Sequence, residues 1–433
     1  MLQKGDKKII RAWTFYDWAN SVYPLVISSA IFPIFYETVT TTRDENGKVI
    51  SDIVEWMGFQ FHNTSFLSYT VALSYLIVAF SSPILSGIAD FSGNKKRFLQ
   101  FFCYLGAVCA MLLSLFSKDN LGWSMTALMF ASVGYWGSLV FYNAYLPEIA
   151  EPQEQDAVSA RGFAMGYLGS SLLLIMILVL AVFTKIISIK TGFLLVGVWW
   201  IGFAQITFSK LPGKSVQVKH EGNPVTKGYR ELMNVFRDVM TRKQLRRFLG
   251  SYFMYNMGVQ TVMIMAVPFA TKAITWNSPE QMKSSLIISI LLIQFLGIAG
   301  SFLMSGLSRK IGNLKTLGLV IALWAVICFV VYQFIHLPVE FYAIAACVGL
   351  VMGGIQALSR STYSKMLPET EDHASYFSFY DVSEKIGLAL GTVTFGLIED
   401  LTGGIRNSVL SLIVIFVIGF LLLLRVPKSE NVH

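Results

Sequence analysis

The chain has 433 residues, of which 54% are hydrophobic and 14% are charged. Because soluble domains carry about 25% charged residues, this composition excludes an ordinary water-soluble protein. The net charge of +8 would suggest nucleic acid as a partner in a soluble protein. In a chain this apolar, we expect the lysines and arginines to mark cytoplasmic loops instead, and we expect no nucleic-acid partner.

Runs of about 20 apolar residues recur along the chain, which is the length a helix needs to cross the hydrocarbon layer. They lack the alternating pattern of barrel strands. The sequence predicts twelve helical spans, at 13–38, 63–88, 98–117, 121–147, 160–184, 191–210, 248–272, 284–307, 315–335, 340–364, 375–398 and 406–426. Both termini then lie on the side that holds most of the Lys and Arg residues, which predicts a multi-pass cell-membrane protein with cytoplasmic termini.

The first span carries polar side chains near its start. Asp17 could be a proton site or a ligand for a substrate amine, or else a helix-start carboxylate that is solvated or paired with Arg11. Asn20 shares a helix face with Asp17 and could bind substrate or a neighbouring helix. Placing a charged side chain inside a membrane span costs at least about 2.5 kcal/mol of insertion free energy. A charge at such a position is therefore a candidate for a structural or functional role. In the loop 39–61 that follows, residues 43–48 are typical of a solvated turn.

A short basic turn follows the second span, from Gly87 to Arg97, and a reduced copy follows the eighth, from Gly306 to Lys315. The first glycine, the Gly-Asn pair and the last lysine recur at one offset, 306 − 87 = 219 residues. We expect this turn to act as a gating loop through the residues Gly87, Asp90, Gly93 and Lys95. The Asp90 carboxylate could bond a helix end or a basic residue of the other half.

A second repeat pairs the ends of the fourth and tenth spans, where Leu146-Pro147-Glu148 recurs as Leu367-Pro368-Glu369. We assign Glu148 and Glu369 to the gating loops and treat Asn143 as a weaker substrate-binding candidate. The repeats predict two parallel six-span halves. Aromatic residues of the spans could line a polar cavity, although they more often pack or anchor; these are Tyr16, Tyr23, Trp136, Tyr142 and Tyr380.

The linker 211–246 is expected to divide a bundle at 1–210 from a second at 247–433. It contains an apolar stripe with helical spacing and interspersed arginines, which predicts an amphipathic helix on the anionic inner leaflet. The stripe consists of Tyr229, Leu232, Met233, Phe236 and Met240.

The tenth and eleventh spans hold the remaining buried charges. Arg360 could clamp a substrate carboxylate or pair with Asp381 or Glu384, and pairing is slightly favoured. Asp381 and Lys385 are spaced to pair along one helix face, with Glu384 beside them. The aligned residues of the fifth span are uncharged, namely Ala160, Phe163 and Ala164. Since a duplication alone would not need this asymmetry, we favour a substrate or proton path over a purely structural ion pair.

Gly87-x-Ala89-Asp90-x-x-Gly93-x-Lys95 resembles the loop motif of the major facilitator superfamily, although Phe91 and Asn94 stand where basic residues are usual. A finer resemblance is to its vacuole-effluxer-like branch, related to the fungal autophagy-related amino-acid effluxer. Its marks are 16–21 (YDWANS) with Phe32-Pro33, 142–148 (YNAYLPE), 356–361 (QALSRS) and Tyr380-Asp381 with Lys385 and Gly387. The resemblance implies an all-α fold of two six-helix bundles that transports small solutes, with amino acids as the known precedent.

Motifs for ATP binding, zinc proteolysis and serine hydrolysis are missing, so we expect a transporter rather than an enzyme, without a cofactor or bound metal. The four cysteines lie in apolar runs without CxxC spacing and are expected to be small core residues. The leading hypothesis is a monomeric carrier of a small polar solute, proton-coupled (symport or antiport) or facilitative. The alternatives are an effluxer of drugs or lipid-like molecules, and a receptor or scaffold that transports nothing.

Overall fold

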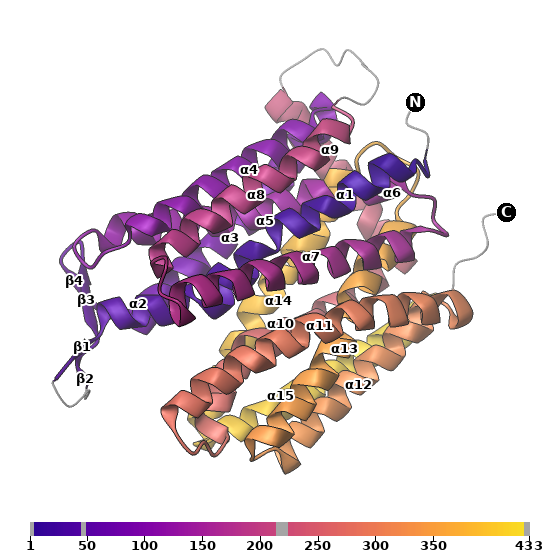
Figure 1. Ribbon diagram of the computed structural model, residues 1–433. Coiled ribbons are helices and arrows are strands. Elements are labelled where there is room, and N and C mark those ends of the chain that lie inside the picture. Colours follow the sequence, from indigo (N-terminus) through magenta and orange to yellow (C-terminus); the bar gives the residue numbers. More distant parts are fainter. Residues whose placement is uncertain (1–3, 45–48, 214–223, 428–433) are drawn as a thin grey trace.

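The computed structural model describes residues 4–44, 49–213 and 224–427. Figure 1 shows two groups of long helices, one formed by the chain before the linker and one by the chain after it. The groups meet where α7 packs against α11 and α13, and where α3 packs against α14.

The first group contains six spans. The first span is divided into α1 (Lys7–Asn20), the wide π-helical η1 (Tyr23–Ala30) and α2 (Phe32–Thr40), and Pro24 and Pro33 lie at the two breaks. Proline lacks a backbone N–H and clashes with the preceding turn, which explains the breaks. The other five are α3 (Asn63–Ser92), α4 (Lys95–Leu112) with η2 (Leu113–Leu115), α5 (Leu121–Asn143) with α6 (Leu146–Ile149), α7 (Gln155–Ile177) with η3 (Leu178–Phe183), and α8 (Ile189–Lys210).

The second group follows the linker helix α9 (Pro224–Thr241). It contains α10 (Lys243–Ala273), α11 (Pro279–Ile311), α12 (Asn313–Phe334), α13 (Pro338–Met366), α14 (His373–Thr402) and α15 (Ile405–Leu424). Each of the twelve predicted spans overlaps one of the long helices in the two groups.

Eleven helical segments of the described chain are long and apolar enough to cross a membrane. The one predicted span outside this set is the eleventh, 375–398, which corresponds to α14; this helix has 30 residues but carries Asp381, Glu384 and Lys385. Exposed aromatic and aliphatic side chains cover the outer faces of the helices, as expected for surfaces that contact lipid. Three cysteines are buried as predicted, whereas Cys347 is exposed on α13, so the prediction was wrong for that residue.

The loop after the first span contains two small hairpins that we did not predict. Strand β1 (Thr42–Arg43) pairs with β2 (Val49–Ser51), and β3 (Ile53–Trp56) pairs with β4 (Phe59–His62). Met57 and Gly58 both have positive φ, which is the backbone of a tight hairpin turn. Residues 45–48 of the predicted solvated turn lie outside the described residues. The alternation of residues 53–62 around Met57-Gly58 was the available sequence signal.

The repeated glycines have different roles in the two halves. Gly93 ends α3 with φ 62° and Gly312 ends α11 with φ 89°, so both occupy a backbone region that favours glycine. Gly87 instead lies against α9, where an added Cβ would approach the Gly228 carbonyl oxygen to 2.4 Å. Its counterpart Gly306 has open space around it. The repeat therefore preserves the turn, while the helix contact belongs to one half.

The linker helix α9 is amphipathic, as predicted, but the face that packs on α3 overlaps the predicted stripe only in part. Leu232 of the stripe is buried together with Val235 and Val239, whereas Tyr229, Phe236 and Met240 of the stripe are exposed. Contact of this exposed stripe with the inner leaflet stays a prediction. Partial burial raises the pKa of Asp238, but hydrogen bonds from Arg242 and Tyr376 outweigh that effect and hold the pKa below its usual value. The bond from Tyr376 ties α9 to α14.

Candidate functional site

Arg360 belongs to α13 in the second half of the protein, but its side chain bonds residues of the first half. Its guanidinium donates to the hydroxyl and the backbone carbonyl of Ser159 at 2.9 Å each, and to the amide oxygen of Asn143 at 3.3 Å. Both terminal nitrogens also lie 3.3 Å from one oxygen of Asp17. Arg360 and Asp17 are only 2% and 5% exposed. A buried ion pair therefore links α1 to α13 across the two halves.

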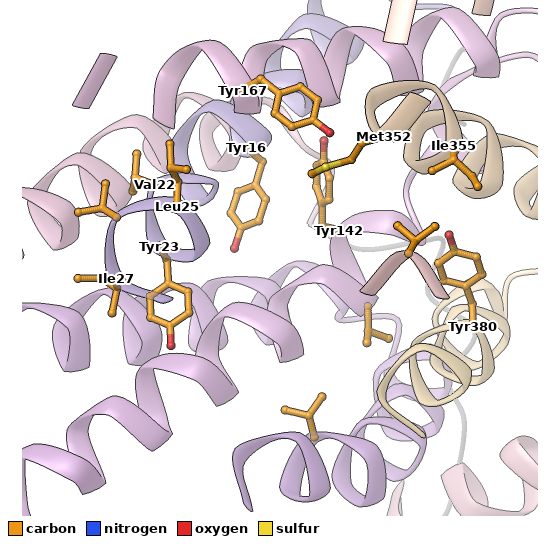
Figure 2. Packing of buried hydrophobic residues seen from close by; sticks show 14 of the residues in the cluster. Tyr16, Val22, Tyr23, Leu25, Ile27, Tyr142, Tyr167, Met352, Ile355 and Tyr380 are labelled. Carbon is orange, nitrogen blue, oxygen red and sulfur yellow. The ribbon is translucent and has the colours of Figure 1, made fainter. Parts of the chain in front are cut away.

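Aromatic rings enclose this pair. The Tyr142 hydroxyl donates to the same Asp17 oxygen at 2.7 Å. The guanidinium carbon lies 4.2 Å from the ring centre of Phe163 and 4.8 Å from that of Trp13, which are cation–π distances. In Figure 2, Tyr142 and Tyr167 turn their hydroxyl ends toward each other where α13 approaches the first half. The Asp17–Arg360 pair is thus held by charge, hydrogen bonds and ring faces together.

The segment 356–361 makes this contact possible. Gln356 accepts a hydrogen bond from the Tyr167 hydroxyl, and the Ala357 carbonyl accepts one from Ser159. Gly162 of α7 provides the space, because a Cβ there would lie 2.3 Å from the Asp17 carboxylate and 2.8 Å from the Arg360 guanidinium. The sequence analysis did not identify Ser159 or Gly162. Their small side chains gave no chemical signal.

Two predicted pairings of these residues were wrong. Asp17 is paired with Arg360, not with Arg11, which is exposed. Arg360 likewise does not pair with Asp381 or Glu384. Six residues on an α-helix correspond to about 120° around the axis, so Arg11 is exposed while Asp17 faces α7 and α13.

The charges of α14 form a second buried cluster. Lys385 donates to Asp381 at 2.9 Å, which confirms the predicted pair along one helix. The Lys385 ammonium also lies 3.6 Å from the ring centre of Trp136 on α5, in the other half. Glu384 lies 3.8 Å from Lys385 and accepts from Gln260 at 2.6 Å. The cluster therefore contacts both halves, and its role in transport stays a prediction.

Three buried polar atoms near these clusters have no hydrogen-bond partner in the described part of the chain. They are the second carboxylate oxygen of Asp381, the hydroxyl of Ser82 on α3, and the amide nitrogen of Asn20. Buried polar groups are nearly always paired, so unpaired ones need an explanation. The Ser82 hydroxyl nevertheless lies near enough to Asp381 to interact with its carboxylate. That Asp381 and Asn20 bind substrate or protons stays a prediction.

The gating-loop residues gather at the ends of the helices near the two chain termini, which we predict to be the inner, cytoplasmic ends (Figure 1). Asp90 accepts hydrogen bonds from the backbone N–H groups of Ser375 at 2.7 Å and Ala374 at 3.3 Å. A carboxylate is stabilised at a helix N-terminus, here that of α14. Asp90 therefore contacts a helix end of the other half, while its role in gating stays a prediction. Lys95 forms an ion pair with Glu148, and Glu148 also lies 3.0 Å from His373 of α14.

Asp156 forms a similar contact that the sequence analysis missed. This residue begins α7 and pairs with Lys365 of α13 at 2.7 Å. It also accepts from Ser308 at 2.9 Å and from Asn313 at 2.8 Å. Asn313 belongs to the repeated Gly-Asn pair, which was the available signal. Glu369, by contrast, is exposed, and the described chain gives it no ion pair, so the structure does not bring it to Glu148.

A cavity of about 150 Å³ lies between η1 and the second half. Leu25 and Ser29 line it from η1, and Met263, Met265 and Gln294 are among its residues from α10 and α11. Figure 2 shows Leu25 beside Tyr23 on η1, with Tyr16 on the preceding part of the same span. The lining is mainly apolar, so the charged clusters lie outside it.

Residues 5–432 match the sequence model of the family described as vacuole effluxer Atg22 like. An uncharacterized MFS-type transporter, YxiO of Bacillus subtilis, is 29% identical over 441 residues, which cover 99% of this chain and 97% of the relative. Autophagy-related protein 22 of Yarrowia lipolytica is 24% identical over 486 residues, which cover 91% of this chain and 82% of the relative.

Solved structures show the same fold. The major facilitator transporter FucP in its outward conformation superposes with a TM-score of 0.69 and 12% identity, covering 98% of this chain and 99% of that one. The human organic anion transporter MFSD10 superposes with a TM-score of 0.73 and 10% identity, covering 97% and 100%.

Family, relatives and fold agree with the sequence analysis on a multi-pass membrane transporter and not an enzyme. The match extends over almost the whole chain, including both repeated turns and both buried charge clusters. This chain belongs to the vacuole effluxer Atg22-like family of major facilitator transporters.

Proposed function

We propose that this protein carries a small zwitterionic solute, of the amino-acid class, by alternating access and with coupling to protons. The moving units are the bundles 1–210 and 247–433, joined by the linker 211–246. The protein acts as a monomer in the cell membrane, with both termini in the cytoplasm. This orientation places the basic residues at the inner ends of the helices on the side where such residues are enriched.

The observation that carries the proposal is the Asp17–Arg360 pair, whose members belong to different halves. When the halves rock, the pair must either break or move as a unit. Separation without compensation would leave two unpaired charges in a dry site, which costs several kcal/mol per ion. A solute that supplies both missing charges would remove this barrier.

A zwitterion meets this requirement. Its carboxylate suits the planar guanidinium of Arg360, and its ammonium suits the Asp17 carboxylate. A neutral sugar or a simple cation would compensate at most one of the two charges. The pair therefore favours a solute that carries both signs.

The α14 cluster supports proton coupling. Asp381 uses one oxygen for Lys385, and the Ser82 hydroxyl of α3 lies near the carboxylate, whose second oxygen makes no hydrogen bond of standard geometry in the described part of the chain. Protonation of that oxygen would weaken the pair with Lys385 and provide a donor for a neighbouring acceptor. Lys385 lies on the ring of Trp136 in the other half. Protonation of Asp381 would therefore change a contact between the two halves.

Uptake into proteoliposomes tests the proposal. The purified chain is reconstituted, a pH gradient is imposed, and uptake is measured for amino acids, dipeptides, nucleosides and sugars, with Lys385→Ala as the impaired variant. We expect saturable uptake of a zwitterion that the gradient accelerates. Absence of saturable flux across the whole panel would count against the carrier, and flux that ignores the gradient would leave a facilitative one.

Efflux of an apolar drug or lipid-like molecule is the second candidate. It is favoured by the mainly apolar cavity beside η1, with its two methionines. Methionine adapts to apolar ligands of varied shape. Competition separates the candidates: zwitterions should block transport if the first is correct, and lipophilic cations should block it if the second is correct.

A further inference from the structure

An open groove of about 330 Å³ lies between the first turns of α1 and the last turn of α8. Lys7, Lys8 and Arg11 line it from α1, and Lys210 lines it from α8. None of the residues that line the groove belongs to the Asp17–Arg360 pair or to the α14 cluster, and the proposed transport mechanism does not use it.

The four cations have no counterion in the described part of the chain. All four are exposed, and none of their side chains forms an ion pair or hydrogen bond there. The nearby Asp6 carboxylate is used to cap α1, since it accepts the backbone N–H of Lys8 at 2.8 Å. Four positive charges from two helices thus converge on one space, which suits a multiply bonded anion such as a phosphate.

The deeper wall of the groove is apolar. Ala12, Phe15 and Ile206 complete its lining, each on the same helix as one or more of the cations. Farther along the same two helices, Trp18 stacks on Trp199 with ring centres 5.5 Å apart. The surface between α1 and α8 therefore changes from cationic at the helix ends to apolar and aromatic toward the middle of the span.

We propose that this groove binds the phosphate headgroup of an anionic phospholipid, with an acyl chain lying along Phe15 and Ile206. The cations would bond the phosphate oxygens, and the apolar wall would replace lipid contacts for the chain. Free phosphate would use the cations and gain nothing from the wall. Because the wall continues directly from the cations into the span, the geometry favours the lipid over the free anion.

Thermal unfolding of the full chain in neutral detergent tests the assignment. The midpoint temperature is measured against the concentration of short-chain phosphatidylglycerol, of phosphatidylcholine with the same chains, and of inorganic phosphate. We expect a saturable rise with phosphatidylglycerol alone. An equal rise with phosphatidylcholine would overturn the role of the cations, and an equal rise with phosphate would overturn the role of the lipid.

Two matched triple variants locate the site. Lys8→Gln/Arg11→Gln/Lys210→Gln removes three charges from the groove and should weaken phosphatidylglycerol binding roughly 10- to 100-fold. Arg309→Gln/Lys310→Gln/Lys315→Gln removes three exposed charges at the same end of the other half and should leave binding unchanged. Equal losses in both variants would show attraction by overall charge and overturn the proposal.

A measurement on the unaltered chain keeps the proposal testable if the groove variant does not fold. Native mass spectrometry from mixed vesicles of phosphatidylglycerol and phosphatidylcholine counts the lipids retained per chain. We expect retained phosphatidylglycerol in excess of its share of the vesicle. Retention in proportion to the vesicle composition would refute a specific anionic-lipid site.

Discussion

Arg360 makes its contacts in the half of the protein to which it does not belong. All five of its side-chain hydrogen bonds end on Asp17, Asn143 or Ser159, and ring faces cover the remaining surface of the guanidinium. A charge in such a place is stabilised only while its partners remain. The residue therefore couples the stability of the fold to the relative position of the two halves.

Removal of one member of this pair should destabilise the protein strongly. Arg360→Met leaves the Asp17 carboxylate buried without a cation, and we expect a loss of about 3–5 kcal/mol in the free energy of unfolding. The double variant Asp17→Asn/Arg360→Met should recover most of that loss because no unpaired charge remains, yet it should not transport. Denaturant unfolding and vesicle uptake measure the two effects. A single variant as stable as the unaltered chain would contradict this account.

Asp381 and Lys385 should matter for transport more than for insertion. Asp381→Asn or Lys385→Ala should abolish uptake while the protein still reaches the membrane, as judged by its yield in the membrane fraction. The control is Glu399→Gln, which breaks the 2.7 Å pair with Lys272. That pair is largely exposed, and exposed pairs contribute little. Unchanged uptake in the α14 variants would leave their pair with a structural role only.

At the scale of the helices, close approaches rather than charges position the site. Two glycines allow such approaches, one between α7 and the Asp17–Arg360 pair and one between α3 and the linker helix. A side chain at either position would displace a neighbour. For each of these two glycines, another helical glycine with open space around it serves as a control.

Gly162→Ala should disturb the ion pair without removing a charge. The new Cβ would lie 2.3 Å from an Asp17 oxygen, so the pair must shift. Overpacking of this kind costs about 1–3 kcal/mol. Gly202→Ala is the control, because no atom lies within 4 Å of its added Cβ and alanine favours a helix. Thermal unfolding of both variants should show a lower midpoint for the first alone, and equal midpoints would refute the tight contact.

Gly87→Ala should loosen α9 from α3. Its Cβ would approach a backbone carbonyl to 2.4 Å, and backbone cannot rotate away as a side chain can. Hydrogen exchange of the α9 amides should therefore accelerate. Gly306→Ala, at the repeated position with open space, should leave the exchange unchanged. Protection of α9 that survives Gly87→Ala would show that the helix is held by other contacts.

At the scale of the whole molecule, two related contacts tie the inner ends of the halves together. Asp90 at the end of α3 bonds the N-terminus of α14, and Asp156 at the start of α7 bonds Ser308 near the end of α11. The two helix pairs correspond in the repeat, but the carboxylate comes from the first half in both cases. The gating role predicted for Asp90 requires both contacts to break before this end opens.

The double variant Asp90→Asn/Asp156→Asn should therefore favour opening at the inner end. Amide side chains lack the charge that each contact uses, so the closed arrangement loses stability. Spin labels on the inner ends of the two bundles should report a larger population of long distances. Glu369→Gln is the control, since that residue is exposed. Identical distance distributions in all three proteins would argue that these contacts do not hold the inner end closed.

The sequence by itself determined what depends on local spacing. The Asp381–Lys385 pair follows from residues four apart on one helix, and eleven of the twelve spans follow from long apolar runs. Positive φ at Gly93 and Gly312 explains why the repeated turns kept glycine. The hairpin at 53–62 could also have been predicted from local spacing, because its residues alternate on either side of Met57-Gly58.

Only the tertiary structure decided which distant residues meet. Asp17 and Arg360 are 343 positions apart, and their pairing depends on how α1, α7 and α13 cross. Gly162 and Ser159 became parts of the site because they leave room and offer one hydroxyl, which no composition or period reveals. The buried face of α9 was likewise set by the α3 surface on which it packs. Spacing along a helix fixes neighbours a few residues apart, whereas contacts between helices depend on packing geometry that the linear order does not contain.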